Sequence, residues 1–454
     1  VLEMEKKGVK EILLRDNEYN SIAVLEVNDI YKPDKHLEAH AVFGGDSEHP
    51  AVVYLHQYTK SMYIGGKLHG FQLPLHYDHK DLRKTPEEMR SIFANRGWHK
   101  VVGFQTRNPM HRAHFELTKK ALQIDPEMNL LVHPGALHFS TYYYYYYYYL
   151  IGMTKPGDID HHTRVKCYRS IMAKYPQGRV DLAVCPLAMR MGGPREAIWH
   201  CIIRKNYGLT HFILGRDHAG PAYNSKNVGF YGPYDARDAA VKHESELGIK
   251  CLAFEQMLYC PQDDTYYSQD QVPEGRSVLQ LGGMEVRERL RTGQDIPEWF
   301  SFKEAVSILR EQHPPRHKQG LTLLLTGLPA SGKSTLANAL RAKLMEIQNR
   351  RVTILNESNV RNIISTDLGF TAEHCNLHIC RLGFISSLVA NAGGIIIVSA
   401  IAPYNESREF CRQICSDVGG YVQVFMSTSL DTCQIRDTKG LYSVFRQGNV
   451  CNCF

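Results

Sequence analysis

Three features are missing from this sequence, and each absence excludes a class of protein. No apolar run reaches the roughly 20 residues that a membrane-spanning helix needs. The first residues, Val1–Lys7, lack the apolar core of a secretory signal peptide. No long basic block occurs, and 53 Lys and Arg against 47 Asp and Glu give a net charge of only +6. We therefore expect neither a membrane nor a nucleic acid as a partner, while the mild positive excess suits small anionic substrates.

The cysteines also lack the spacings that disulfide frameworks and zinc sites require. Cys451 and Cys453 lie too close together to bridge each other, and no second cysteine pair has a spacing that would complete a zinc site with them. Several of the twelve cysteines fall in apolar stretches, among them Cys185, Cys201, Cys260 and Cys415. This distribution predicts reduced, buried thiols and a cytoplasmic protein.

The length and the alternation of apolar runs predict several α/β domains. A chain of 454 residues exceeds what one core supports, so roughly three domains are expected. Short β-like runs separated by turns fill the segment up to residue 78, and examples are Ile12–Leu14, Ile22–Val27 and Ala51–Leu55. From Thr85 onward strands alternate with helices, which is the pattern of a parallel sheet. We expect strands at 100–105, 129–133, 180–185 and 210–215, and helices at 86–95, 109–122, 161–175, 194–207 and 234–246.

The most informative segment runs from Gln105 to His114, directly after the apolar strand Val101–Phe104. Asn108 is a suitable N-cap and Pro109 fits the first position of a helix. The helix N-terminus, the planar guanidinium of Arg107 and two imidazoles then converge on one anion site. The His111–His114 spacing also fits a metal pair, but no third ligand stands nearby, so we expect no metal site.

One further loop is expected to share a crevice with this segment. Gly215–Pro221 follows the apolar strand Phe212–Leu214, and its small residues let the backbone approach a ligand closely. Because ligands of parallel sheets bind at the carboxyl ends of strands, this loop and Gln105–His114 should meet. Met189–Ala197 is, by itself, a loop that leads into another helix.

A second phosphate-binding motif lies beyond a Pro-rich linker at residues 312–318. Gly327–Ser334 follows the apolar run Leu321–Leu325 and precedes a helix, the context that a P-loop needs. In such a loop Gly327 and Gly332 allow backbone N–H groups to surround phosphates. Lys333 reaches the β and γ groups, and Ser334 can bind Mg²⁺.

One segment fits no element. Tyr142–Tyr149 is a run of eight tyrosines, and neither a strand nor a helix can bury every ring and pair every phenol. We interpret it as an inserted surface loop.

At Gln105–His114 the sequence closely resembles the nucleotidyltransferase motif of the ATP sulfurylases (sulfate adenylyltransferases) of the fungal and bacterial type. The resemblance extends over about residues 10–310. It implies that ATP and sulfate react to adenosine 5′-phosphosulfate and pyrophosphate in the first step of sulfate assimilation, with Mg²⁺ arriving on ATP. It assigns sulfate binding to Gln105, Arg107 and Ala219, and catalysis to Thr106, Arg107, Asn108, His111 and His114. It assigns nucleotide binding to Gly215, Arg216, Asp217, His218 and Met257.

The second module resembles adenylyl-sulfate kinase, through motifs that include Leu368–Phe370 and Ile401–Tyr404. Active kinases carry an Asp-Gly-Asp run where this chain has Asn356–Ser358, and arginine and asparagine where it has Cys375, His378 and Cys380. We therefore expect nucleotide binding without kinase turnover, with 3′-phosphoadenosine 5′-phosphosulfate as a further candidate ligand. Two alternatives stay open: a bifunctional enzyme that is also an adenylyl-sulfate kinase, and a non-catalytic nucleotide-binding protein.

Together these observations predict an α/β multidomain protein. Its parts are a β-rich N-terminal remnant at 1–78, a Rossmann-like nucleotidyltransferase domain at 79–257, a small linker domain at 258–318 and a truncated P-loop kinase-like domain at 319–454. We also expect a homo-oligomer.

Overall fold

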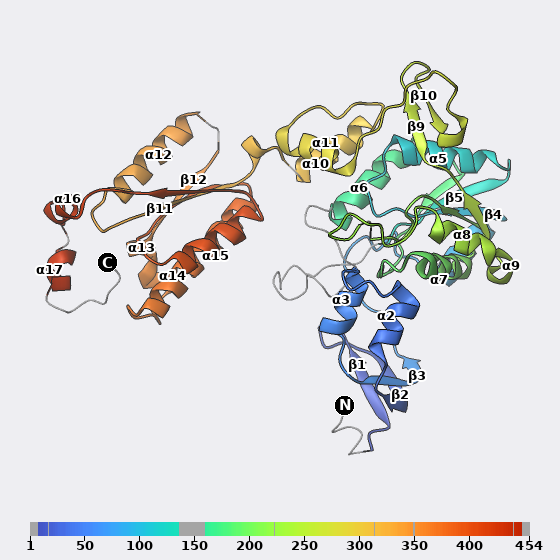
Figure 1. Ribbon diagram of the computed structural model, residues 1–454, viewed down its shortest axis with the longest axis horizontal. Coiled ribbons are helices and arrows are strands. Elements are labelled where there is room, and N and C mark those ends of the chain that lie inside the picture. The colour runs from blue at the N-terminus through green and yellow to red at the C-terminus, as the bar shows by residue number, and fades with distance from the viewer. Residues whose placement is uncertain are drawn as a thin grey trace. The chain divides into compact units, whose positions relative to one another are not determined.

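The computed structural model describes residues 8–16, 18–135, 159–221, 223–312, 314–347, 350–438 and 440–446 (Figure 1). The chain forms two compact units, one of Val1–Arg287 with Ile296–Gln312 and the other of Glu288–Asp295 with His313–Phe454. The tyrosine run Tyr142–Tyr149 lies outside the described residues. The division into four domains stays a prediction.

The first unit begins with a small antiparallel sheet and two helices. Strands β1 (Glu11–Arg15), β2 (Ser21–Tyr31) and β3 (Tyr63–Gly70) pair in that order, and α2 (Lys35–Phe43) and α3 (Pro50–Gln57) lie between β2 and β3. The expectation of a β-like run at Ala51–Leu55 is therefore wrong. Pro50 occupies the first turn of α3 and the His49 side chain accepts the backbone N–H of Ala51, so helix capping outweighed the β propensity of the two valines.

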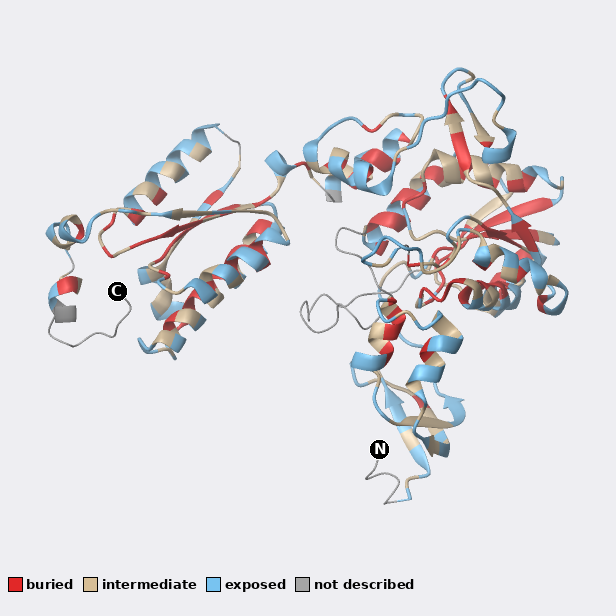
Figure 2. Ribbon diagram, in the orientation of Figure 1, coloured by how far each residue is buried: buried red, intermediate tan, exposed pale blue. Residues whose placement is uncertain are grey.

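A five-stranded sheet, ordered β6-β5-β4-β7-β8 and parallel throughout, forms the centre of the first unit. Its strands are β4 (Lys100–Phe104), β5 (Met128–Val132), β6 (Val180–Leu182), β7 (His211–Leu214) and β8 (Lys250–Ala253). Four of these confirm the expected strands, and β8 is an addition. The strands are largely buried, as Figure 2 shows, because helices cover both faces. The chain leaves β4 toward β5 and β6 and then returns to β7 on the other side of β4, so the order switches between β4 and β7.

The helices around this sheet match the expected ones closely. They are α4 (Pro86–Asn95), α5 (Arg112–Gln123), α6 (His161–Met172), α7 (Gly193–Asn206), α8 (Asp235–Lys242) and α9 (Glu244–Leu247). The expected start of α5 is wrong: the helix begins at Arg112 with His111 as N-cap, so Asn108 and Pro109 belong to a loop. Met110 is fully buried in that loop, and its burial holds the segment away from helical geometry.

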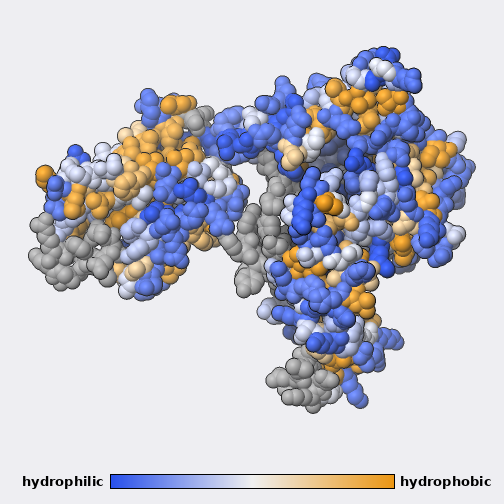
Figure 3. All heavy atoms as spheres, viewed as in Figure 1, coloured by the Kyte–Doolittle hydropathy of each residue, from blue (hydrophilic) through white to orange (hydrophobic). Residues whose placement is uncertain are grey.

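A smaller part of the first unit follows the parallel sheet. It contains the antiparallel pair β9 (Met257–Cys260) and β10 (Thr265–Ser268), the helix α11 (Lys303–Gln312) and most of the segment that leads to α10 (Gly283–Thr292). Figure 3 shows that hydrophilic residues dominate the visible surface around α10 and α11.

The second unit is a four-stranded parallel sheet with helices. The order is β12-β13-β11-β14, formed by β12 (Val352–Asn356), β13 (Ile395–Ser399), β11 (Leu321–Thr326) and β14 (Gly420–Phe425). Its helices are α12 (Lys333–Ile347), α13 (Glu357–Ile364), α14 (Ala372–Asn391), α15 (Asn405–Ser416), α16 (Leu430–Ile435) and α17 (Leu441–Arg446). This confirms the second α/β module. Among the described residues of both units, no helix combines the length and apolar character needed to span a membrane.

Candidate active site

A cavity of about 440 Å³ opens at the carboxyl ends of β4 and β7 in the first unit. These neighbouring strands lie where the strand order switches, which is where parallel sheets bind ligands. The loop after β4, the loop after β7, the segment before α7 and the approach to β9 supply the walls. Predicted site residues that line the cavity are Gln105, Thr106, Arg107, Asn108, His114, Gly215, Arg216, Asp217, His218, Ala219 and Met257.

Helix α6 holds the loop after β4 by its backbone. The Tyr168 hydroxyl lies 3.2 Å from the carbonyl oxygen of Thr106 and 2.8 Å from that of Asn108. Arg164 donates to the carbonyl oxygen of Arg107 at 3.0 Å. Because the carbonyl groups are bound from behind, the side chains of the loop are free to face the cavity.

A fully buried arginine, Arg204 on α7, positions Gln105. Its guanidinium donates to the Gln105 side-chain oxygen and, at 3.2 Å, to the carbonyl oxygen of His133. Burial lowers the pKa of Arg204. The amide oxygen of Gln105 is therefore fixed toward the protein, and its amide nitrogen lies 3.6 Å from the sulfur of Met189.

The two histidines of the loop differ in position. His114 lines the cavity, and its Nδ1 accepts the backbone N–H of His111 at 3.1 Å, so a neutral ring carries its proton on Nε2. His111 does not line the cavity: its Nδ1 lies 3.0 Å from the hydroxyl of Ser301, and its ring packs on Phe300. Burial lowers the pKa of His111 to about 3 and that of His114 to about 4, so both rings are neutral near pH 7.

The loop after β7 has unusual backbone geometry. Asp217 and Ala219 have φ of +54° and +55°, in the left-handed region that residues with a Cβ rarely adopt. The Asp217 N–H donates to the carbonyl oxygen of Pro233 at 2.7 Å, and the Ala219 carbonyl accepts the Gly193 N–H at 3.1 Å. Arg216 bonds to the side chain of Gln256 at 3.0 Å. These contacts fix the loop in a conformation that its own sequence disfavours.

A chain of polar side chains leads inward from the cavity. His218 Nε2 lies 3.0 Å from Nδ1 of His200, and the other nitrogen of His200 lies 3.3 Å from Glu196 Oε1. Glu196 also accepts the backbone N–H groups of Arg190 and Gly192. Burial lowers the pKa of His200 and of His218 to about 3, and it raises the pKa of Glu196.

Sequence analysis missed this inner layer of polar residues, although α7 carried a signal for it. Glu196, His200 and Arg204 recur every four residues, so they lie on one side of the helix, and all three are buried. Polar residues at helical spacing are usually assigned to a solvated face. Here they lie behind the residues that line the cavity: Arg204 bonds to Gln105, His200 lies beside His218, and Glu196 accepts two backbone N–H groups, which offsets part of the cost of their burial.

The P-loop of the second unit joins β11 to α12 as predicted. Gly327 has φ of +142°, and a Cβ there would come within 2.9 Å of the carbonyl oxygen of Met426, so only glycine fits. Lys333 donates to the carbonyl oxygens of Gly327 and Leu328 at 2.8 and 2.7 Å. The hydroxyl of Ser334 lies 3.1 Å from the amide nitrogen of Asn356.

Comparisons with known proteins agree with this architecture. Residues 80–312 match the family model described as ATP-sulfurylase, residues 319–453 that described as adenylylsulphate kinase, and residues 3–73 that described as a PUA-like domain. They confirm the predicted fold class, with the N-terminal part identified as PUA-like.

Curated relatives match almost the whole chain. A sulfate adenylyltransferase of Chaetomium globosum is 47% identical over 449 residues, which are 99% of this chain and 76% of the relative. A sulfate adenylyltransferase of Phaeosphaeria nodorum is 48% identical, and the match covers 98% of this chain and 76% of the relative. A solved structure described as a hexameric APS kinase from Thiobacillus denitrificans is 28% identical with a TM-score of 0.73, covering 97% of this chain and 80% of that one.

Proposed function

The chain belongs to the ATP-sulfurylase family, and we propose that the cavity between β4 and β7 is where it joins ATP to sulfate. The chain is a sulfate adenylyltransferase, an enzyme that converts ATP and sulfate to adenosine 5′-phosphosulfate and pyrophosphate. The observation that carries the assignment to this cavity is the convergence of Gln105, Arg107, His114 and the Gly215–Gly220 loop at the strand-order switch.

The reaction needs no covalent enzyme intermediate. A sulfate oxygen attacks the α-phosphorus of ATP, the new P–O bond to sulfate forms, and the bond from the α-phosphorus to the bridging oxygen of pyrophosphate breaks. The enzyme then contributes orientation and stabilisation of the developing charge. In this proposal Arg107 pairs with a sulfate or phosphate oxygen through its planar guanidinium, and Ala219 and Gln105 complete the sulfate contact.

The neutral histidines act as hydrogen-bond donors rather than as charges. His114 offers Nε2–H to the phosphates, in line with its pKa of about 4. His111 faces Ser301 and Phe300, so its proposed role is to fix the start of α5 through the bond from its N–H to His114. Gly215, Arg216, Asp217, His218 and Met257 form the proposed nucleotide side.

Magnesium is expected on the phosphates of ATP instead of in a protein cage. Among the described residues that line the cavity, the carboxylates are Asp217 and Glu255, whereas a dedicated site needs several oxygen ligands. When bound, the ion would neutralise phosphate charge. The proposal further includes a cytoplasmic location, since the ten described cysteines are free thiols and all but Cys380 are buried. It also includes a homo-oligomer, since the similar Thiobacillus denitrificans protein is described as hexameric.

For the second unit we propose nucleotide binding without phosphoryl transfer. Glu357, in the segment that replaces the acidic run of active kinases, is partly buried and accepts the backbone N–H of Ile401 at 2.7 Å. Burial raises its pKa, so this carboxyl does not serve as an exposed acidic ligand. The adenylylsulphate kinase match over residues 319–453 favours 3′-phosphorylation as the alternative.

One incubation distinguishes a sulfate adenylyltransferase from a bifunctional enzyme and from a non-catalytic protein. The full chain is given ATP, Mg²⁺, labelled sulfate and pyrophosphatase, and the nucleotides are resolved. Adenosine 5′-phosphosulfate alone supports the proposal, and its loss in Arg107→Ala ties the reaction to the cavity. A 3′-phosphorylated product would establish the bifunctional alternative, and no product at all would contradict catalysis.

A further inference from the structure

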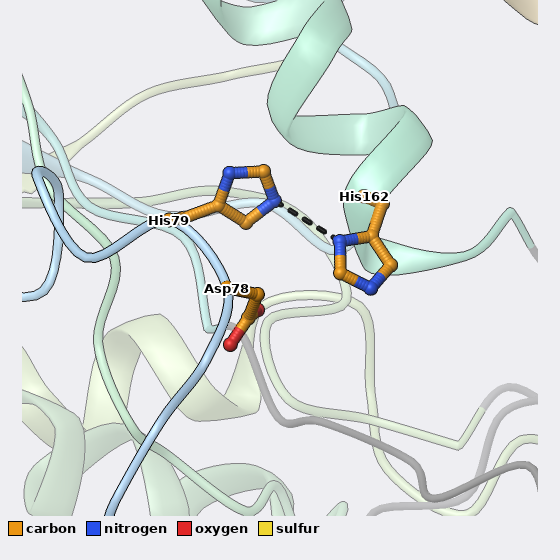
Figure 4. Close-up of side chains that lie close together, drawn as sticks. All are labelled: Asp78, His79 and His162. Carbon is orange, nitrogen blue, oxygen red and sulfur yellow. Dashed lines mark hydrogen bonds between the residues drawn. The ribbon is translucent and has the colours of Figure 1, made fainter.

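A cluster of histidine and aspartate side chains lies outside the proposed active site, where the loop before α4 meets the first turn of α6. Asp78 and His79 come from the loop, and His162 comes from α6 (Figure 4). One ligand atom from each of the three side chains lies within 4.8 Å of the others. The mechanism proposed above uses none of them.

The two imidazoles have the separation that a shared metal ion requires. His79 Nε2 and His162 Nδ1 lie 3.2 Å apart, and Figure 4 shows the two rings with these nitrogens facing each other. Two ring nitrogens on one tetrahedral zinc ion, each at 2.0–2.1 Å, are about 3.3 Å apart. The separation of the two nitrogens therefore matches that of two ligands of one ion.

Contacts with Arg83 and His161 orient the Asp78 carboxylate, the third side chain of the cluster. Arg83 donates to both oxygens of the Asp78 carboxylate at 2.9 Å, and His161 Nε2 lies 2.9 Å from Oδ2. A carboxylate offers about four acceptor positions, so these three contacts leave capacity for an ion. Metal-binding carboxylates are commonly held by such partners, which fix their orientation.

We propose that Asp78, His79 and His162 form a binding site for one divalent transition-metal ion of the zinc class, completed by water. Two imidazoles with one carboxylate favour Zn²⁺, Ni²⁺ or Co²⁺ over Mg²⁺ and Ca²⁺, which prefer oxygen ligands alone. His79 and His162 are 83 positions apart in the chain, so no local spacing could reveal the site in the sequence.

The site would act on the candidate active site through α6. His162 lies in the first turn of α6, and Arg164 and Tyr168 of the same helix bind the carbonyl oxygens of the Thr106–Asn108 loop. An ion that joins the start of α6 to the Asp78–His79 loop would stabilise the helix that positions this loop. The expected role is therefore structural, with a higher Tm for the first unit.

The test measures metal binding directly and requires no activity. The full chain, treated with chelator and kept reduced, is titrated with Zn²⁺ in the absence of nucleotide, and Co²⁺ is added in parallel to read the ligand type from its absorption spectrum. His79→Gln and His162→Gln are compared with His243→Gln. His243 is a matched control because its ring also lies near a carboxylate, with Nδ1 3.6 Å from Glu246.

We expect one Zn²⁺ per chain in the parent and in His243→Gln, and at least tenfold weaker binding in each site variant. The Co²⁺ spectrum should show nitrogen and oxygen ligation, and Zn²⁺ should raise the Tm of the parent but not of His79→Gln/His162→Gln. Circular dichroism checks that the variants are folded. Equal binding by the double variant, no binding by the parent at tenfold excess of Zn²⁺, or a thiolate charge-transfer band would each overturn the proposal.

Discussion

At the residue scale, Arg204 and Arg107 differ in burial and in the contacts that their guanidinium groups make. Arg204 is fully buried and bonds to Gln105 and to the His133 carbonyl, so its removal would leave buried acceptors unpaired. Arg107 is only partly buried, and the contact recorded for its guanidinium is with the sulfur of Met191 at 3.5 Å. Arg107 can therefore be truncated without loss of the fold, which makes it the sharper probe of function.

Arg107→Ala should lower kcat/KM for sulfate by at least about 100-fold, or roughly 3 kcal/mol of transition-state stabilisation. The Tm should stay close to that of the parent. Pyrophosphate release in a coupled assay measures the rate. Arg96→Ala is the control, because Arg96 is a surface arginine paired with Asp181 at 2.8 Å, away from the cavity. Activity within tenfold of the parent would refute a role for Arg107 in binding the anion.

At the scale of elements, α6 holds the Thr106–Asn108 loop through the Tyr168 hydroxyl and the Arg164 guanidinium. Tyr168 is fully buried, and burial raises its pKa to about 12, so its hydroxyl stays protonated and can donate to the loop. The backbone of Thr106–Asn108 forms no regular element of its own. Its shape consequently depends on these donors from α6.

Tyr168→Phe should lower kcat by about tenfold while the chain remains folded, because the ring still fills its place but the loop loses its donor. Tyr175→Phe is the matched control, since its buried hydroxyl bonds to Thr118 instead of to the loop. Steady-state kinetics of both variants give the comparison. If the two substitutions have the same effect on kcat, general loss of buried hydrogen bonds explains it and α6 does not position the loop.

Four strands of the first unit's parallel sheet, and the helices around it, could be predicted from sequence because short apolar runs alternate with helical segments, whereas the short strand β8 was missed. The candidate site could be predicted only in part. The loops after β4 and β7 were predicted because their motifs come directly after strands. The start of α5 was wrong because the burial of Met110 and the bonds from Tyr168 are tertiary effects. Arg204 was missed because polar residues at the four-residue spacing of Glu196, His200 and Arg204 are ordinarily assigned to a solvated helix face, and only tertiary packing shows that all three are buried.

At the scale of the whole molecule, burial of neutral histidines links stability to pH. His133 and His200 have no exposed surface, and burial lowers the pKa of His133 well below its usual value and that of His200 to about 3. The unfolded chain binds a proton on each near pH 6.5. Their contribution to stability is therefore fully present above pH 6.5 and is lost as the pH falls toward the native pKa.

The free energy of unfolding of the first unit should consequently fall between pH 7 and pH 5, by up to about 1.4 kcal/mol per pH unit for each fully buried histidine, and its urea midpoint should fall with it. Tryptophan fluorescence reports on this unit alone, since Trp98, Trp199 and Trp299 are the three tryptophans of the chain and all lie in it. Burial raises the pKa of Glu196, so this carboxyl contributes the opposite pH dependence of stability. It is one group, whereas several buried histidines lower the stability as the pH falls. An unchanged midpoint at pH 5 would show that these histidines are protonated in the native state.

The division into two units also predicts which functions can be removed separately. Among the described residues, Lys333 bonds to Gly327 and Leu328 of the second unit, and the residues that line the cavity between β4 and β7 belong to the first. Lys333→Ala should therefore weaken binding of a fluorescent adenine nucleotide to the second unit by at least tenfold, because the P-loop ammonium pairs with the β and γ phosphates. Sulfate activation should stay within twofold of the parent. Arg107→Ala should instead lose sulfate activation and keep nucleotide binding in the second unit.

A large loss of sulfate activation in Lys333→Ala would mean that nucleotide binding in the second unit controls the first. Robust 3′-phosphorylation by the parent that disappears in Lys333→Ala would instead establish that the second unit is a working kinase.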